Sequence, residues 1–206
     1  MISLTDDQQD ALREIANLAM GEAGVNLSKV LNTYVELSIP TIHITQIDQI
    51  ANFLTEVNAH LGEIISIIRL GFQGFFSGEV LLVYGPRAIE TVSELLDESL
   101  HNESQEMMLL REISNILAAA CLNGITQRLD SNIIITPPSL YCHRMSITDS
   151  FNAMFAKNII NWYETLFIKI SFKFENKDFQ CNLIVFFSEN CIEKLQQRLE
   201  KILNEF

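Results

Sequence analysis

Two stretches of the chain carry the same three residues in the same order: a Glu, an Asn three positions later and a Pro twenty-three positions after the Asn. The first set is Glu14, Asn17 and Pro40, and the second, displaced by 98 residues, is Glu112, Asn115 and Pro138. A carboxamide neither titrates nor attacks as a nucleophile, so its contribution to a reaction is to position another group. Chance seldom keeps three positions in register over such a distance. The repetition therefore indicates one small polar site presented twice.

Each Glu and Asn pair needs a helix to bring its side chains together, because residues three or four apart share a helix face. In the first set Asp10 extends this stripe by one turn, whereas Met108 occupies the equivalent place in the second. A lone pair of this kind is usually part of a solvated helix face. Asn is a mediocre helix former, however, and this choice of residue, together with the repetition, favours a site.

The elements expected around the first pair begin with a helix whose start is marked by a capping box of Thr5 and Gln8. Apolar residues recur at helical spacing as far as Leu31, which predicts that the helix extends to that residue. Gly21 and Gly24 either allow another backbone to approach closely or divide the helix in two. The rest of the first half is expected to form a strand over residues 34–44 that includes Pro40, a short helix within 47–60, a hairpin of 63–72 with 79–84, and a helix from Pro86 to about Leu96.

The second half repeats this order. It is expected to contain a helix over 103–130, extended chain over 133–138, an ambiguous stretch over 147–160, a hairpin of 167–174 with 179–187 and a terminal helix over 189–203. An isolated hairpin is marginally stable, and joining the two halves solves that problem. We therefore predict an α+β fold, a pseudo-two-fold duplicated unit with one antiparallel sheet of about six strands flanked by helices. Residues 1–206 would form a single domain of two homologous halves, about 1–100 and 101–206.

The composition argues against several classes of function. With 14 basic and 26 acidic residues the formal net charge is −12, which disfavours nucleic acid as a partner because its phosphates need basic groups. No secretory signal opens the chain and no apolar run approaches the roughly 20 residues that span a bilayer, so we expect a cytoplasmic protein with no membrane partner. The four cysteines lack CxxC spacing and the four histidines are scattered, which predicts reduced thiols and no metal site.

The repeated residues resemble the signature of the CheC/CheX/FliY phosphatases of bacterial chemotaxis, which reads D/S-x3-E-x2-N-x22-P. The first copy matches every fixed position and the second matches all but the first, with the residues Asp10, Glu14, Asn17 and Pro40 and then Glu112, Asn115 and Pro138. Two such signatures in two similar halves make the chain most like CheC. The likeness covers nearly the whole chain.

The resemblance implies an enzyme, an aspartyl-phosphate phosphatase that hydrolyses the acyl phosphate of a CheY-type response regulator. Asn17 and Asn115 would each orient the attacking water, as the Gln of small GTPases does. Glu14 and Glu112 would hold the regulator by pairing with its active-site lysine. The chain would need no cofactor of its own, because Mg²⁺ would arrive with the regulator.

The remaining positions of the signature would support the site rather than react: Asp10, Pro40 and Pro138. Because Met108 replaces the acid of the first copy, we expect the first site to be the more active one, so that Asn17→Ala costs more activity than Asn115→Ala.

Two alternatives remain open. Flagellar switch scaffolds such as FliM have a related fold without the catalytic pairs, and the chain could be a non-catalytic binding module of that kind. An intermediate case is a slow phosphatase regulated by a partner, since CheC in some systems binds the receptor deamidase CheD. Two sites in one chain fit a monomer better than a one-site dimer.

Overall fold

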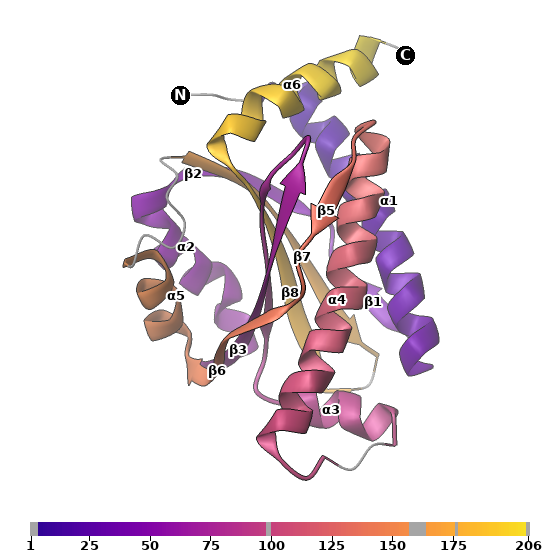
Figure 1. Ribbon diagram of the computed structural model, residues 1–206, viewed down its shortest axis with the longest axis vertical. Helices are drawn as coiled ribbons and strands as arrows, with labels where there is room; N and C mark the ends of the chain where they lie inside the picture. The colour runs from indigo at the N-terminus through magenta and orange to yellow at the C-terminus, as the bar shows by residue number, and fades with distance from the viewer. Residues whose placement is uncertain (1–3, 98–99, 157–163, 176, 205–206) are drawn as a thin grey trace.

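The structure, a computed structural model that describes residues 4–97, 100–156, 164–175 and 177–204, has three layers (Figure 1). A sheet forms the middle layer. Helices α1 (Asp6–Leu31) and α4 (Glu103–Arg128) cover one face, and α2 (Ile47–Asn58) and α5 (Ile147–Ala156) cover the other. The shorter α3 (Ala88–Leu95) lies near the start of α4, α6 (Glu189–Asn204) crosses the other end of the molecule, and a 3-10 turn η1 (Ala59–Leu61) follows α2. The predicted α+β class is confirmed.

All eight strands of the described chain lie in one sheet, and every pairing is antiparallel. The strands are β1 (Val35–Leu37), β2 (Thr41–Gln46), β3 (Ile64–Gly74), β4 (Gly78–Tyr84), β5 (Ile133–Ile135), β6 (Ser139–Ser146), β7 (Glu164–Phe174) and β8 (Gln180–Phe187). They fill six positions across the sheet, because β1 and β2 both pair with β7 while β5 and β6 both pair with β3. The expected sheet of about six strands is therefore present, with each edge strand broken into two.

The two halves of the chain exchange their edge strands. Strands β1 and β2 of the first half pair with β7 of the second, and β5 and β6 of the second half pair with β3 of the first. The exchange is symmetric, since Leu37 lies opposite Phe172 at one edge and Phe72 lies opposite Ile135 at the other. Each half completes its sheet with strands of the other, which supports the proposal of one domain built from two homologous halves.

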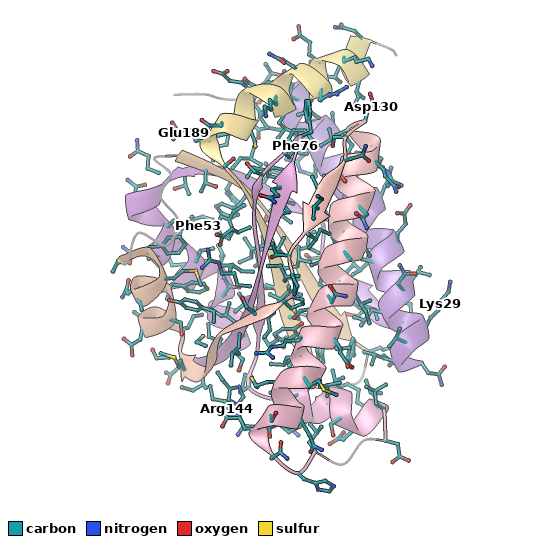
Figure 2. All side chains as sticks on the ribbon, viewed as in Figure 1. Lys29, Phe53, Phe76, Asp130, Arg144 and Glu189 are labelled. Carbon is teal, nitrogen blue, oxygen red and sulfur yellow. The ribbon has the colours of Figure 1, made fainter. Side chains whose placement is uncertain are left out.

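Alternation along the central strands divides the interior into two cores. In β4, Val80 and Leu82 face the core under α1 and α4, whereas Leu81 and Val83 face the core under α2 and α5. Burying such a side chain stabilises the fold by about 1.5–3 kcal/mol, so both faces of the sheet need covering helices. On the α2 side, Phe53 packs against a phenylalanine of β7 with ring centroids 5.2 Å apart (Figure 2).

Helix α1 begins at the predicted capping box. The Thr5 Oγ1 accepts a hydrogen bond from the Gln8 backbone N–H at 3.2 Å, and the Gln8 Oε1 accepts one from the Thr5 N–H at 3.1 Å. The helix is not divided at its glycines but runs unbroken to Leu31. Gly24 instead allows close packing, because a Cβ there would lie 2.8 Å from the Leu37 side chain of β1.

The extended chain differs from the prediction at both edges of the sheet. The strand expected over 34–44 is two strands, with Pro40 buried in the link between them. Proline has no N–H and a fixed φ, so it interrupts pairing with β7. Pro138 lies in the matching link between β5 and β6. Strand β6 has no counterpart among the predicted elements. It is an edge strand whose residues are mostly half-buried or exposed, and buried and exposed residues do not alternate along it, so its sequence gives no strand signal.

Three further expectations can be compared with the structure. The ambiguous stretch over 147–160 forms α5 as far as Ala156, and residues 157–160 lie outside the described part. All four cysteines are free and buried. By length and composition alone α4 could cross a membrane, but 56% of the 18-residue apolar window within it is buried inside the protein, and core helices pass the same test. The helix is therefore weak evidence for a membrane span.

Candidate active site

The two Glu and Asn pairs lie on the long helices α1 and α4, which run side by side in opposite directions over one face of the sheet (Figure 1). All four side chains are exposed: Glu14, Asn17, Glu112 and Asn115. Within the described residues none of them makes a hydrogen bond or an ion pair. Their donors and acceptors therefore face solvent and are available to another molecule.

The second set lines a groove of about 440 Å³ between α4 and the link that joins β5 to β6. The helix contributes Met108, Arg111, Glu112 and Asn115 to one wall, and the end of β5 and the link after it contribute Ile135, Thr136, Pro137 and Pro138 to the other. The structure thus brings together three residues that the sequence places up to 26 positions apart. The repeated proline marks the strand break that forms the second wall.

The first set has a related arrangement around α1. Pro40 lies in the link between β1 and β2, and α1 packs against both of these strands. It is buried, whereas Glu14 and Asn17 are exposed on the helix. Pro40 is therefore placed to shape the chain beside the helix, as a supporting residue would be.

An arginine precedes each Glu, and the two arginines have different surroundings. Arg13 forms an ion pair with Asp10, one turn earlier on α1. At the second set Met108 stands in the place of that acid and is 60% exposed. Arg111 has no ion pair within the described chain. The arginines repeat at the same offset of 98 residues as the Glu and Asn pairs, a signal that could have added them to the predicted site.

Ser114 fixes the rotation of α4 beside the second set. It is fully buried, and its Oγ lies 2.9 Å from the Oη of Tyr84 on β4. Burial raises the pKa of Tyr84 well above its ordinary value, so the phenol stays protonated. Successive helix residues are about 100° apart, so a serine facing the sheet turns Asn115 towards the groove.

The two helices contact each other directly. A Cβ on Gly124 of α4 would lie 2.7 Å from the Cβ of Ala19, which shows how closely the backbones approach. Arg128 of α4 donates to Glu22 of α1 at 2.8 Å, and this guanidinium lowers the pKa of the Glu22 carboxyl. The two candidate sites are therefore carried by two closely packed helices.

The described residues contain no group of three or more His, Cys, Asp or Glu side chains that could hold a metal ion. Near the start of α4, Arg144 pairs with Glu90 at 3.0 Å and with Glu106 at 3.6 Å (Figure 2). The charged groups there are thus paired with one another, unlike those of the groove.

These features define a class of protein: a pseudo-two-fold α+β fold that carries an exposed Glu and Asn pair on each of two adjacent long helices. This is the fold of the CheC/CheX/FliY family, which the flagellar protein FliM shares.

Particular relatives support this assignment, although no protein-family model matches the chain. The chain is 22% identical over 129 residues to the CheY-P phosphatase CheC of Bacillus subtilis, a match that covers 59% of this chain and 60% of CheC. FliY of Thermotoga maritima has a similar structure, with a TM-score of 0.71 and 16% identity over 96% of this chain and 98% of that one. The FliM middle domain of H. pylori gives a TM-score of 0.64 and 11% identity, over 95% and 99%.

The resemblance to the CheC/CheX/FliY family is therefore confirmed, through its fold and through a distant sequence similarity to CheC. At these identities the structural likeness concerns the fold. It does not separate CheC from FliY or FliM, so the closer likeness to CheC stays a prediction.

Proposed function

We propose that this chain is a cytoplasmic phosphatase that hydrolyses the aspartyl phosphate of a CheY-type response regulator. The observation that carries the proposal is the duplicated, exposed Glu and Asn pair whose polar groups have no partner in the described chain, with one copy lining a groove. The similarity to CheC, itself a CheY-P phosphatase, supports the same chemistry.

The asparagines supply orientation. In this mechanism the carboxamide of Asn17 or Asn115 accepts a hydrogen bond from a water and holds it opposite the acyl oxygen of the phosphoaspartate. The water oxygen attacks phosphorus, the bond from phosphorus to the aspartyl oxygen breaks, and the products are inorganic phosphate and the free carboxylate. Phosphoryl transfer needs chiefly this in-line positioning and neutralisation of charge, so a carboxamide suffices.

The glutamates supply attachment. Glu14 and Glu112 are exposed carboxylates one turn from the asparagines, well placed to pair with a lysine of the regulator. Glu112 is the single carboxylate among the eight residues that line the groove. Mg²⁺ requires a near-octahedral set of oxygen ligands, so in this mechanism the regulator carries the ion.

A non-catalytic scaffold is the second candidate, because the FliM middle domain shares the fold. A scaffold has no need of two exposed pairs of the same residues, which is why we favour the phosphatase. Binding of a regulatory partner such as CheD is compatible with either function. We propose that the chain acts as a monomer with neither nucleic acid nor membrane as a partner.

The direct test measures phosphate release from a phosphorylated CheY-type receiver with Mg²⁺, in the presence and absence of the purified chain. We expect the wild-type chain to accelerate release and the Asn17→Ala/Asn115→Ala double variant to lose that acceleration. Both asparagines are exposed and unbonded, so the thermal unfolding midpoint of the double variant should match the wild type.

Each alternative result has a distinct meaning. Binding of the receiver without acceleration, across all receivers of the same cell, would support the scaffold. Full acceleration by the double variant would show that the asparagines do not position the water.

A further inference from the structure

The two candidate sites differ in the charge that they present. Asp10, Arg13 and Glu14 of the first site combine two acids with one base, a formal charge of −1. The second site keeps only Arg111 and Glu112, one base and one acid, because Met108 replaces the aspartate. An incoming phosphoryl group, which is itself strongly anionic, therefore meets less repulsion at the second site.

The groove of the second site offers few groups that could hold an anion. Arg111 is the one cation among the eight lining residues. On the opposite wall Pro137 and Pro138 have no backbone N–H, and the Thr136 N–H already donates to the Gly71 carbonyl at 2.9 Å. The Thr136 Oγ1 accepts a hydrogen bond from the Gly71 N–H at 2.7 Å, so its hydroxyl keeps one neutral donor. The guanidinium of Arg111 is thus the one charged donor in the groove, beside the neutral amide of Asn115 and the hydroxyl of Thr136.

These two side chains come from the same helix face, because Arg111 is four residues before Asn115. Arg111 is exposed and has no ion pair in the described chain, so no internal partner competes for its guanidinium. At the first site Arg13 occupies the same place relative to Asn17, but its guanidinium is paired with Asp10.

We propose that Arg111 binds the phosphoryl oxygens of the substrate beside the water held by Asn115, and that this contact makes the second site the more active of the two. The proposal rests on the phosphatase function proposed above. A guanidinium matches two phosphate oxygens with two parallel N–H groups and neutralises the charge of the transferring phosphoryl group. The expectation from the signature alone, that the incomplete second copy is the weaker site, is thereby reversed.

The test uses chains in which only one site works. In the Asn17→Ala background, where the second site operates alone, Arg111→Ala should lower phosphate release roughly tenfold or more, since arginines that contact a transferring phosphoryl group have large effects. Arg111→Lys keeps the positive charge but loses the two parallel N–H groups of the guanidinium. Its rate of phosphate release should therefore lie between those of the Asn17→Ala parent and the Arg111→Ala variant. Lys29→Ala, which removes an exposed cation near the far end of α1, is the matched control and should leave release unchanged (Figure 2).

A reciprocal exchange tests the charge difference between the sites. In the Asn17→Ala background, Met108→Asp places an acid one turn before Arg111 and should lower release severalfold. In the Asn115→Ala background, Asp10→Met frees Arg13 and should raise release by the first site. Of the two parent variants, Asn115→Ala should retain less activity than Asn17→Ala.

A binding measurement separates a contact with the phosphoryl group from general docking. The receiver carrying beryllium fluoride on its aspartate, a mimic of the phosphoryl group, should bind the Asn17→Ala/Arg111→Ala chain more weakly than the Asn17→Ala chain. Affinity for the unmodified receiver should be the same for both.

The outcomes distinguish this inference from the proposed function. If the Asn17→Ala/Asn115→Ala chain is inactive but Arg111→Ala releases phosphate as fast as its parent, the arginine contact is wrong and the phosphatase proposal stands. If the double asparagine variant is as active as the wild type, both proposals fail. Equal loss of affinity for the modified and unmodified receivers would assign Arg111 to docking alone and overturn the phosphoryl contact.

Discussion

The asparagines of this chain show how a single residue type takes two roles. Asn182 is buried and donates to the Oδ1 of Asn58 at 2.6 Å, and Asn58 donates to the Leu54 carbonyl at 2.7 Å. Buried polar groups need such partners. Asn17 and Asn115 are exposed and make no hydrogen bond within the described residues. The two buried asparagines are therefore bonded within the fold, whereas the two repeated ones keep their amide groups exposed to solvent.

The buried cysteines give a prediction at the same scale. Burial raises the pKa of the Cys121 thiol from 9.0 to about 12, and it raises that of Cys181 as well. The thiolate is the reactive form, so at pH 8 the native protein should react with a thiol reagent far more slowly than the protein in urea. Rapid reaction of all four thiols in the folded state would contradict this burial.

The same pKa shift has a consequence for stability. Folding raises the pKa of the Cys121 thiol, so its contribution to stability is complete below pH 9 and is lost as the pH rises towards about 12. The free energy of unfolding, measured in urea, should therefore fall above pH 9. In the Cys121→Ala variant this fall should be smaller, while at pH 7 the variant only loses packing.

At the scale of single residues, the sequence predicts which side chains share a helix face better than it predicts what surrounds them. Spacing on a helix was sufficient to place Glu112 beside Asn115, because helix periodicity is local. The bond between Ser114 and Tyr84 could not be predicted in that way, since it joins residues 30 positions apart on different elements. Tertiary contacts of this kind decide which face of α4 points outwards.

At the scale of elements, the contact between α1 and α4 depends on small residues. Gly124 is buried where the helices approach, and a Cβ there would lie 2.9 Å from the Cα of Ala19. Backbone atoms cannot move aside as a flexible side chain would. The position of both sites relative to each other is therefore set at this contact.

Two glycine variants test this contact. Gly124→Ala should lower the free energy of unfolding by about 1–3 kcal/mol, the usual cost of overpacking, less what alanine adds to helix stability. Gly21→Ala is the control, because a Cβ at Gly21 has nothing within 4 Å, and it should stabilise α1 by up to about 1 kcal/mol. If Gly124→Ala and Gly21→Ala changed the free energy of unfolding in urea equally, the helices could move apart at Gly124 at little cost.

Edge strands were the elements hardest to predict from the sequence. Strands β3, β4, β7 and β8 contain long apolar runs and were expected as two hairpins. Strand β6 is an edge strand with one buried residue, Cys142, and its pattern gives no strong period. Local pattern also cannot name the partner of a strand, so the exchange between the halves was not foreseen.

At the scale of the whole molecule, the exchange predicts how the halves behave apart. Residues 1–100 would retain the β3 and β4 hairpin without β5 and β6 beside it, and an isolated two-stranded sheet is marginal in water. Residues 1–100 and 101–206, expressed separately, should each lack a cooperative thermal transition.

Mixing the two fragments provides the control. The mixture should regain a cooperative transition and near-ultraviolet circular dichroism, because each fragment supplies the edge strands of the other. A fragment that folds cooperatively alone would show that its edge strands can pair within the same half.

Because each half of the chain pairs its edge strands with the other half, the sheet has the arrangement that two identical chains would give by exchanging edge strands. A shorter chain with one copy of the pattern would complete the same sheet only by pairing with a second, identical copy, and its two sites would then have to be the same. Joining both copies in one polypeptide removes that requirement. The copies differ at Asp10 and Met108, so a chain that carries both copies can vary its two candidate sites separately while they share one sheet.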